Sequence, residues 1–342
     1  QFVQQLGMLM TSWQATTFLI GEYVSSDPEA NPIMTVADGV LSLTQVHEHS
    51  TVVRKMRVVK MRGRAHLAGS HNFRITGDGL RTYPRLLPPL PDDRIPGVAI
   101  YRDPRRISVG VPGLDKMLNG GLPEGHTMLV SGPTGSGKTI LATRFLQEGA
   151  RLGEKGVAVY FEKGTPRLRN AELAEMIQKG DVSVVESRLL DLTVEELIDE
   201  LEQTLQRTGA TRLVIDSLSE FDLYMAPEYH AELRLAVFRL LSAVAKQGVS
   251  ALVTIGLNDV FGELRFGEAN IPFLTDAIVT LRYAEVDGKL QKFMSVVKVR
   301  GSAHSTDLRA YRITDEGLEI DALPTEVIGV FGGAAARALA PG

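Results

Sequence analysis

The sequence predicts an α/β fold built around a doubly wound, mostly parallel sheet. Short apolar runs alternate with segments of helical periodicity between residues 127 and 255, which is typical of parallel sheets with helices on both faces. The first apolar run leads into residues 132–139, GPTGSGKT, which fit the phosphate-binding P-loop pattern G-x-x-x-x-G-K-[ST]. The motif follows a strand and opens a helix, so one stretch predicts both the fold class and a phosphate site.

The individual elements are predicted from apolar periodicity and from their ends. Thr193 and Glu196 fit a capping box at the start of an amphipathic helix that continues through Leu205. In chain order, the other expected elements are a strand at 127–130, a helix from 140, a strand at 156–162, a helix at roughly 169–178, a strand at 212–217, a helix at about 228–247, and strands at 249–255 and 293–301.

The P-loop residues suit the binding of a polyphosphate and Mg²⁺. Glycines allow the backbone to curl so that several N–H groups point inward, and the following helix adds its positive end. Lys138 is expected to reach the β- and γ-phosphates, and the Thr139 hydroxyl is expected to hold Mg²⁺ together with Asp216. The expected phosphate-binding residues are Gly132, Thr134, Gly135, Ser136, Gly137, Lys138 and Thr139.

Three polar residues are expected at the carboxyl ends of parallel strands, where ligands of such sheets bind: Glu162, Asp216 and Thr254. Asp216 fits the metal-holding acid, and the structural alternative is a strand-end acid that caps the next turn. Glu162 is a candidate to orient or deprotonate an attacking water, and its alternative is a surface acid. Lys298 and Arg300 alternate along a predicted strand and so share one face. They could bind a phosphate, or their charges could protect a solvated strand edge from pairing with another chain.

Two segments of the chain resemble each other at a constant offset of 238 residues, from Asp38/Asp276 to Leu80/Leu318. The correspondence matches Lys60, Arg62 and His66 with Lys298, Arg300 and His304. Such a long period indicates a duplicated domain. The expected organisation is the C-terminal part of a first domain at 1–87, whose P-loop half would precede Gln1, a proline-rich linker at 88–104, a complete second domain at 105–322 and a tail at 323–342.

The composition excludes several classes of site. The 342 residues contain no cysteine, which rules out disulfides and thiolate metal sites within them and suits a cytoplasmic setting. The apolar runs are too short for a membrane-spanning helix. The formal net charge of −4 and the lack of a basic arm make DNA an unlikely partner.

Several motifs together resemble a KaiC-type domain of the RecA-like ATPase superfamily. They are SVGVPGLD at 108–115, GGLPEG at 120–125, the P-loop, YFE at 160–162, IDSLS at 215–219, KVRGSAH at 298–304 and RIT at 312–314. The resemblance implies a double-ring hexamer that binds ATP at subunit interfaces. It also implies that Lys298 and Arg300 reach the γ-phosphate of a neighbouring subunit, that Lys60 and Arg62 do so in the first ring, and that His304 and His66 lie nearby.

The chain departs from the family pattern at two places. The family commonly has two adjacent acids where this chain has Glu162-Lys163, and the clock protein has a Ser-Thr phosphorylation pair where this chain has Pro272-Phe273, with Thr275 as the nearest hydroxyl. The leading hypothesis is therefore a Mg²⁺-dependent, oligomeric ATPase that serves signalling or regulates a partner protein. The alternatives are a Ser/Thr autokinase, a nucleotide-gated scaffold and a RecA-like DNA-binding protein.

Overall fold

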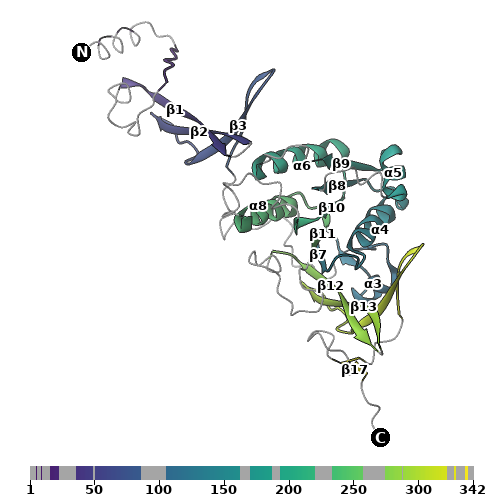
Figure 1. Cartoon of the computed structure of the whole chain (residues 1–342). Coiled ribbons are helices and arrows are strands. Elements are labelled where there is room, and N and C mark those ends of the chain that lie inside the picture. The colour runs from purple at the N-terminus through teal and green to yellow at the C-terminus, as the bar shows by residue number, and fades with distance from the viewer. Residues whose placement is uncertain are drawn as a thin grey trace. The chain divides into compact units, whose positions relative to one another are not determined.

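The computed structural model (Figure 1) describes most of the chain as separate stretches. They are residues 5, 9, 16–22, 36–48, 51–85, 105–161, 170–186, 193–219, 233–256, 274–286, 288–321, 327–328 and 336–337. The chain divides into two units, residues 1–86 and residues 87–342, and each unit is described by itself. No helix in these described stretches is long and apolar enough to cross a membrane.

The larger unit is built on a nine-stranded sheet in the order β15-β14-β13-β12-β7-β11-β10-β8-β9. From β12 to β9 the neighbouring strands are parallel, whereas β12 to β15 form an antiparallel meander. The strands are β7 (Thr127–Gly132), β8 (Gly156–Tyr160), β9 (Val182–Glu186), β10 (Arg212–Asp216), β11 (Ser250–Gly256), β12 (Ala277–Val286), β13 (Lys289–Val299), β14 (Arg309–Thr314) and β15 (Gly317–Ile320). The predicted α/β fold with a mostly parallel sheet is confirmed.

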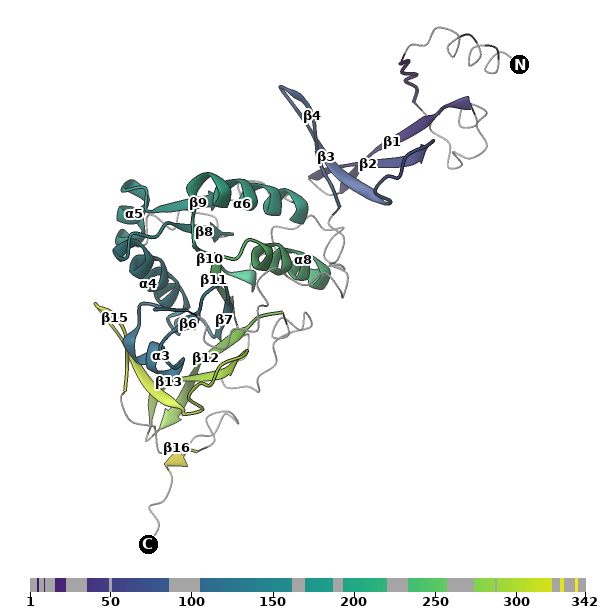
Figure 2. The same cartoon turned by 180° about the vertical axis from the view of Figure 1, so that it is seen from behind.

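Helices cover both faces of the parallel region (Figures 1 and 2). α4 packs on β10, β11 and α5, while α6 and α8 pack on each other. The helices are α3 (Pro112–Met117), α4 (Lys138–Arg151), α5 (Ala171–Gln178), α6 (Val194–Thr208) and α8 (Leu233–Lys246), and the short strands β5 (Arg106–Ile107) and β6 (Leu122–Pro123) pair beside them. The predicted capping box begins α6, because Thr193 and Glu196 exchange backbone and side-chain hydrogen bonds.

The apolar core divides along the two faces of the sheet. Met128, Val130, Val214 and Leu252 join one cluster with residues of α3, α4 and α5. The intervening residues Leu129, Leu213, Ile215 and Val253 are also fully buried, and alternation along a strand points them to the opposite face. Burial on both faces explains why these strands read as continuous apolar runs in the sequence.

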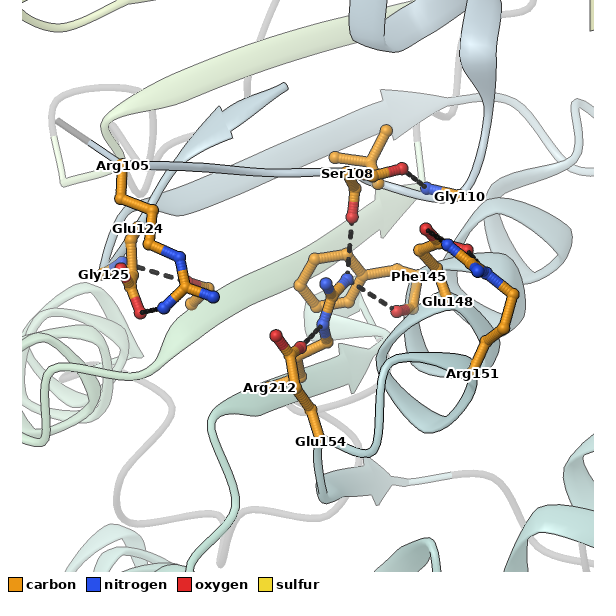
Figure 3. A network of polar contacts seen from close by, with 12 residues as sticks. Arg105, Ser108, Gly110, Glu124, Gly125, Phe145, Glu148, Arg151, Glu154 and Arg212 are labelled. Atoms are coloured by element: carbon orange, nitrogen blue, oxygen red, sulfur yellow. Dashed lines mark hydrogen bonds and ion pairs between the residues drawn. The ribbon is translucent and has the colours of Figure 1, made fainter. Parts of the chain in front are cut away.

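A buried arginine, Arg212, binds the C-terminal half of helix α4 (Figure 3). Arg212 begins β10 and is only 1% exposed. Its Nε donates to Glu154 Oε2 at 2.5 Å, and its Nη1 donates to the carbonyl oxygens of Ser108 and Phe145 at 2.8 and 3.0 Å. The guanidinium also lies 4.7 Å from the Phe145 ring centroid. Arg212 therefore joins the last turns of α4 to the segment that precedes α3.

The smaller unit contains a four-stranded antiparallel sheet in the order β1-β2-β3-β4. Its strands are β1 (Gly39–Glu48), β2 (Thr51–Met61), β3 (Ser70–Thr76) and β4 (Gly79–Tyr83). β1 and β2 correspond to β12 and β13 at the offset seen in the sequence, and the pairing shifts between Val40 and Leu41 as it does between Ile278 and Val279. Each unit thus contains its own copy of the same meander, with a β-bulge at the corresponding position.

Candidate functional site

The P-loop connects the end of β7 to the start of α4, as its sequence predicts. Gly135 and Gly137 have φ values of 77° and 97°, which lie in the left-handed region that favours glycine. A Cβ on Gly132 would lie 2.7 Å from Ser136 Oγ, so this glycine allows the loop to close on itself. The loop geometry therefore depends on the two glycines that define the motif, Gly132 and Gly137, and on Gly135 between them.

Lys138 folds back over the loop. Its ammonium group donates to the carbonyl oxygens of Gly132 and Pro133 at 2.8 and 2.9 Å. The cation is thus held above the loop, where it would be positioned to bind a phosphate group.

Two further features suit this loop to an anion. Gly137 is the N-cap of the 14-residue helix α4, and its first turn receives no side-chain cap from the described residues, as suits a helix end that binds an anion. Ser136 Oγ is fully buried and has no hydrogen-bond partner among the described residues. A buried hydroxyl without a partner is costly. The residues present therefore fit a polyphosphate.

A hydroxyl–carboxylate cluster lies beside the P-loop. Thr139 Oγ1 donates to Asp216 Oδ2 at 2.8 Å. Thr254, on the strand between β7 and β10, donates from its own hydroxyl to Asp216 Oδ1. Hydroxyl and carboxylate oxygens are the ligands that Mg²⁺ prefers. The structure thus brings together the two predicted metal residues, Thr139 and Asp216, and adds Thr254 as the residue that orients the carboxylate.

Two tyrosines of the antiparallel meander contact the P-loop backbone, and no local sequence pattern indicates either contact. Tyr311 OH donates to the carbonyl oxygen of Ser136 at 2.5 Å, and Tyr283 OH approaches that of Thr134 at 3.4 Å. Burial raises the pKa of the Tyr311 hydroxyl, which keeps it protonated as a donor. The meander therefore supports the loop from strands more than a hundred residues away in the chain.

Glu162, the predicted water-activating acid, lies outside the described residues, which stop at Phe161 on this side. The strand that leads to it, β8, ends at Tyr160 and pairs in parallel with β10, where Tyr160 lies opposite Asp216. The pKa of Tyr160 is raised by burial and by the nearby Asp216 carboxylate. The role of Glu162 remains a prediction.

The P-loop follows the carboxyl end of β7, whereas the opposite end of this strand lies level with Lys298, Arg300 and His304. β13 ends at Val299, one residue before Arg300, and Val299 pairs with Ala277, which pairs with Met128 near the start of β7. The P-loop begins at the other end of β7. At the rise of a strand it lies roughly 16 Å along the strand from the level of Arg300, and roughly 10 Å from the level of Lys298, which pairs with Ile278 opposite Leu129. Both distances exceed the reach of a lysine or arginine side chain. These residues therefore do not share a site with the P-loop of their own chain.

The corresponding residues of the smaller unit repeat this placement. Met61 ends β2 opposite Gly39, and Arg62 follows it. One end of the smaller unit's meander thus carries Lys60, Arg62 and His66. The corresponding end of the larger unit's meander carries Lys298, Arg300 and His304. The arginines share a further contact, an ion pair with an aspartate: Arg62 with Asp38 at 3.2 Å and Arg300 with Asp276 at 3.4 Å.

The fold and the P-loop agree with a comparison to known protein families. The family described as "ATPase: KaiC" matches residues 1–86 and 107–325. The chain belongs to the KaiC family. The sheet with its P-loop accordingly represents the RecA-like fold of KaiC ATPases, as the motifs predicted.

Individual KaiC proteins cover most of this chain. It is 30% identical over 291 residues to the circadian clock oscillator protein KaiC of Picosynechococcus sp.. The matched region covers 83% of this chain and 54% of the relative. The identity is 29% to KaiC 1 of Synechocystis sp., with 83% and 54% covered, and 28% to KaiC of Prochlorococcus marinus, with 88% and 60% covered. The chain thus spans about half the length of the curated relatives that it matches.

Proposed function

We propose that this chain binds ATP with Mg²⁺ at its P-loop and hydrolyses it. The observation that carries the proposal is the convergence of the P-loop, the Lys138 ammonium and the Thr139–Asp216 pair at one edge of the sheet. Membership of an ATPase family supports the same conclusion.

Each part of the site has a separate task. Backbone amides of residues 134–139 and the Lys138 ammonium bind the phosphates. Thr139 and Asp216 hold Mg²⁺, which neutralises charge on the phosphate oxygens when it is bound. Glu162 accepts a proton from the attacking water. Asp216 stays in place because Thr254 hydrogen-bonds its second oxygen.

We further propose that the site is completed by a neighbouring subunit in a ring, which we expect to be a hexamer. Lys298 lies near the last residue of β13 and Arg300 directly follows that strand, at the opposite end of β7 from the P-loop of their own chain, so they serve a nucleotide only on another subunit. Two cations near a γ-phosphate would stabilise the charge that develops during transfer. His304 lies in the same loop and contributes to that interface. Lys60, Arg62 and His66 have this task in the smaller unit. Such a nucleotide-dependent ring would suit signalling or the regulation of a protein partner.

A Ser/Thr autokinase would use the same nucleotide site with a different acceptor. The relatives are named circadian clock oscillator proteins, which keeps this alternative open. However, the hydroxyl nearest to the matching position, Thr275, is fully buried, and Pro272 and Phe273 lie outside the described residues. The burial of Thr275 thus supports the proposal that water is the phosphoryl acceptor.

The test is phosphate release from ATP and Mg²⁺ by the full chain, fractionated by size. We expect Glu162→Gln to lower turnover by about 10²-fold or more while ATP still binds. Lys138→Ala should abolish both binding and turnover, and full turnover in this variant would exclude the proposed site. Tight ATP binding without turnover in wild type would instead indicate a nucleotide-gated scaffold.

Labelling with γ-³²P-ATP separates the remaining alternatives. Label that stays in inorganic phosphate supports a hydrolase, whereas label on serine or threonine of the chain supports the kinase. Salt-sensitive DNA affinity would favour a RecA-like DNA-binding protein.

A further inference from the structure

We propose that Asp276 is the positioning residue for Arg300, and that it anchors this arginine to the strand that carries the chain's own P-loop. The inference rests on the proposed function, in which Arg300 serves the nucleotide of a neighbouring subunit. It assigns a task to a carboxylate that does not belong to the P-loop cluster.

Each oxygen of the Asp276 carboxylate has a separate partner. Oδ2 accepts a hydrogen bond from the backbone N–H of Thr127 at 3.0 Å, at the first residue of β7. Oδ1 lies 3.4 Å from Arg300 Nη1. The backbone adds two bonds, from Asp276 N to Thr127 O at 2.9 Å and from Arg300 N to Asp276 O at 2.8 Å. Asp276 therefore connects the start of β7 with the arginine beyond the end of β13.

The same aspartate–arginine contact occurs in the smaller unit, where Arg62 N donates to Asp38 O at 2.8 Å and the side chains are 3.2 Å apart. The arginine side chains are similarly exposed, 55% for Arg62 and 54% for Arg300. The aspartates differ, because Asp38 is 88% exposed and Asp276 is 26% exposed. The contact thus belongs to the meander itself, and β7 adds the anchor in the larger unit.

The ion pair between Asp276 and Arg300 adds little to the free energy of folding. Ion pairs with exposed partners contribute little to folding because water screens them and the long side chains lose freedom. Fixing the direction of an arginine is a different benefit, because a pre-oriented guanidinium loses less entropy when it meets a phosphate.

The neighbouring cation gives a second reason for a carboxylate here. The pKa of Lys298 is lowered by burial and by the positive charge of Arg300, and the Asp276 carboxylate counteracts this effect. Asp276 thus also helps two nearby cations to coexist. The loop that follows is tied down as well, because Arg106 Nη2 donates to Ser302 Oγ at 2.5 Å.

The test uses mixed oligomers of the full chain, co-expressed with two affinity tags and purified on both. A Lys138→Ala chain lacks the P-loop cation but keeps Arg300, and an Arg300→Ala chain has the reverse defect. If sites are shared, the mixture hydrolyses ATP faster than either parent. A mixture no faster than its parents would reject the shared site, and with it the role of Asp276.

Asp276→Asn is then added to one chain at a time, because asparagine keeps an oxygen for Thr127 N–H and replaces the charged oxygen that faces Arg300 with an NH2 donor. Added to the Lys138→Ala chain, which donates the arginine, it should lower the restored turnover by about fivefold or more. Added to the Arg300→Ala chain, it should change nothing, which also demonstrates that the variant folds. An equal loss in both backgrounds, or no loss in either, would overturn the inference.

Asp181→Asn is the matched control in the Lys138→Ala chain. Asp181 forms an ion pair with Lys155 at 2.9 Å and is 29% exposed, close to the exposure of Asp276. We expect no change in restored turnover, because Lys155 has no part in the proposed site. A loss as large as that of Asp276→Asn would overturn the assignment to Arg300. In the otherwise unmodified chain, Asp276→Asn should lower turnover while the Kd for ADP stays within about twofold of wild type.

Discussion

The Thr139 hydroxyl donates a 2.8 Å hydrogen bond to Oδ2 of Asp216, joining the first turn of α4 to the carboxyl end of β10. The two residues are 77 positions apart in the chain. They meet because β7 and β10 are parallel strands that end at the same edge of the sheet, with β11 between them. This pair is the part of the site on which metal binding is expected to depend.

Thr139→Ala should raise the Mg²⁺ concentration required for ATP binding by about tenfold or more, because it removes an oxygen ligand. Thr139→Ser keeps the hydroxyl and should restore the requirement of wild type. Titration of Mg²⁺ against fluorescent ATP binding measures both variants. Identical metal requirements for alanine and serine would contradict the assignment of Thr139.

Thr254→Val should also raise the Mg²⁺ requirement, by up to about tenfold, because Asp216 loses the hydroxyl that orients it. Thr280→Val is the control, since Thr280 is equally buried but hydrogen-bonds Ser295 on β13. It should not change the metal requirement. If both variants shift the titration alike, the effect comes from the core and not from Asp216.

Tyr311→Phe should weaken ATP binding by about three- to tenfold, because the P-loop loses its bond at the Ser136 carbonyl. The smaller unit has Phe73 at the corresponding position, so the ring itself fits the meander. Tyr283→Phe is the comparison, and its effect should be smaller because its contact is 3.4 Å long. Isothermal titration with ATP provides the test, and a larger loss in Tyr283→Phe would refute this ranking.

Arg212→Met should lower the free energy of unfolding by about 3–5 kcal/mol, because the carbonyls of Ser108 and Phe145 lose a buried donor and Glu154 loses its cation. Lys155→Met removes a half-exposed pair with Asp181 and should cost less than about 1 kcal/mol. Chemical denaturation of both variants measures the difference. Equal midpoints would show that the Arg212 network does not stabilise the fold.

Much of the nucleotide site could be predicted from local sequence. The P-loop sequence requires glycines at positions of positive φ, and it places a lysine and a threonine at the start of a helix, whatever the rest of the fold does. Asp216 could be found because the strand β10 is buried on both faces, so its apolar run ends visibly at a carboxylate. The capping box of Thr193 and Glu196 is likewise a contact within one helical turn.

The bounds of the strand around Lys298 differ from the prediction. The apolar pattern predicts a strand at 293–301, whereas β13 begins at Lys289 and ends at Val299. The early residues of β13 form no continuous apolar run, so the pattern misses them.

The sequence by itself determined the family, the parallel sheet, the phosphate loop and the repeat of the meander, because each depends on residues close together in the chain or on a constant offset. Only the tertiary structure decided that Tyr311 supports that loop and that Thr254, already expected at the same ends of the strands as Asp216, hydrogen-bonds that carboxylate. Both contacts depend on strand order and register, which local periodicity does not encode. The structure also decided that Arg300 lies at the opposite end of β7 from the P-loop, because an antiparallel strand returns the chain to the start of β7.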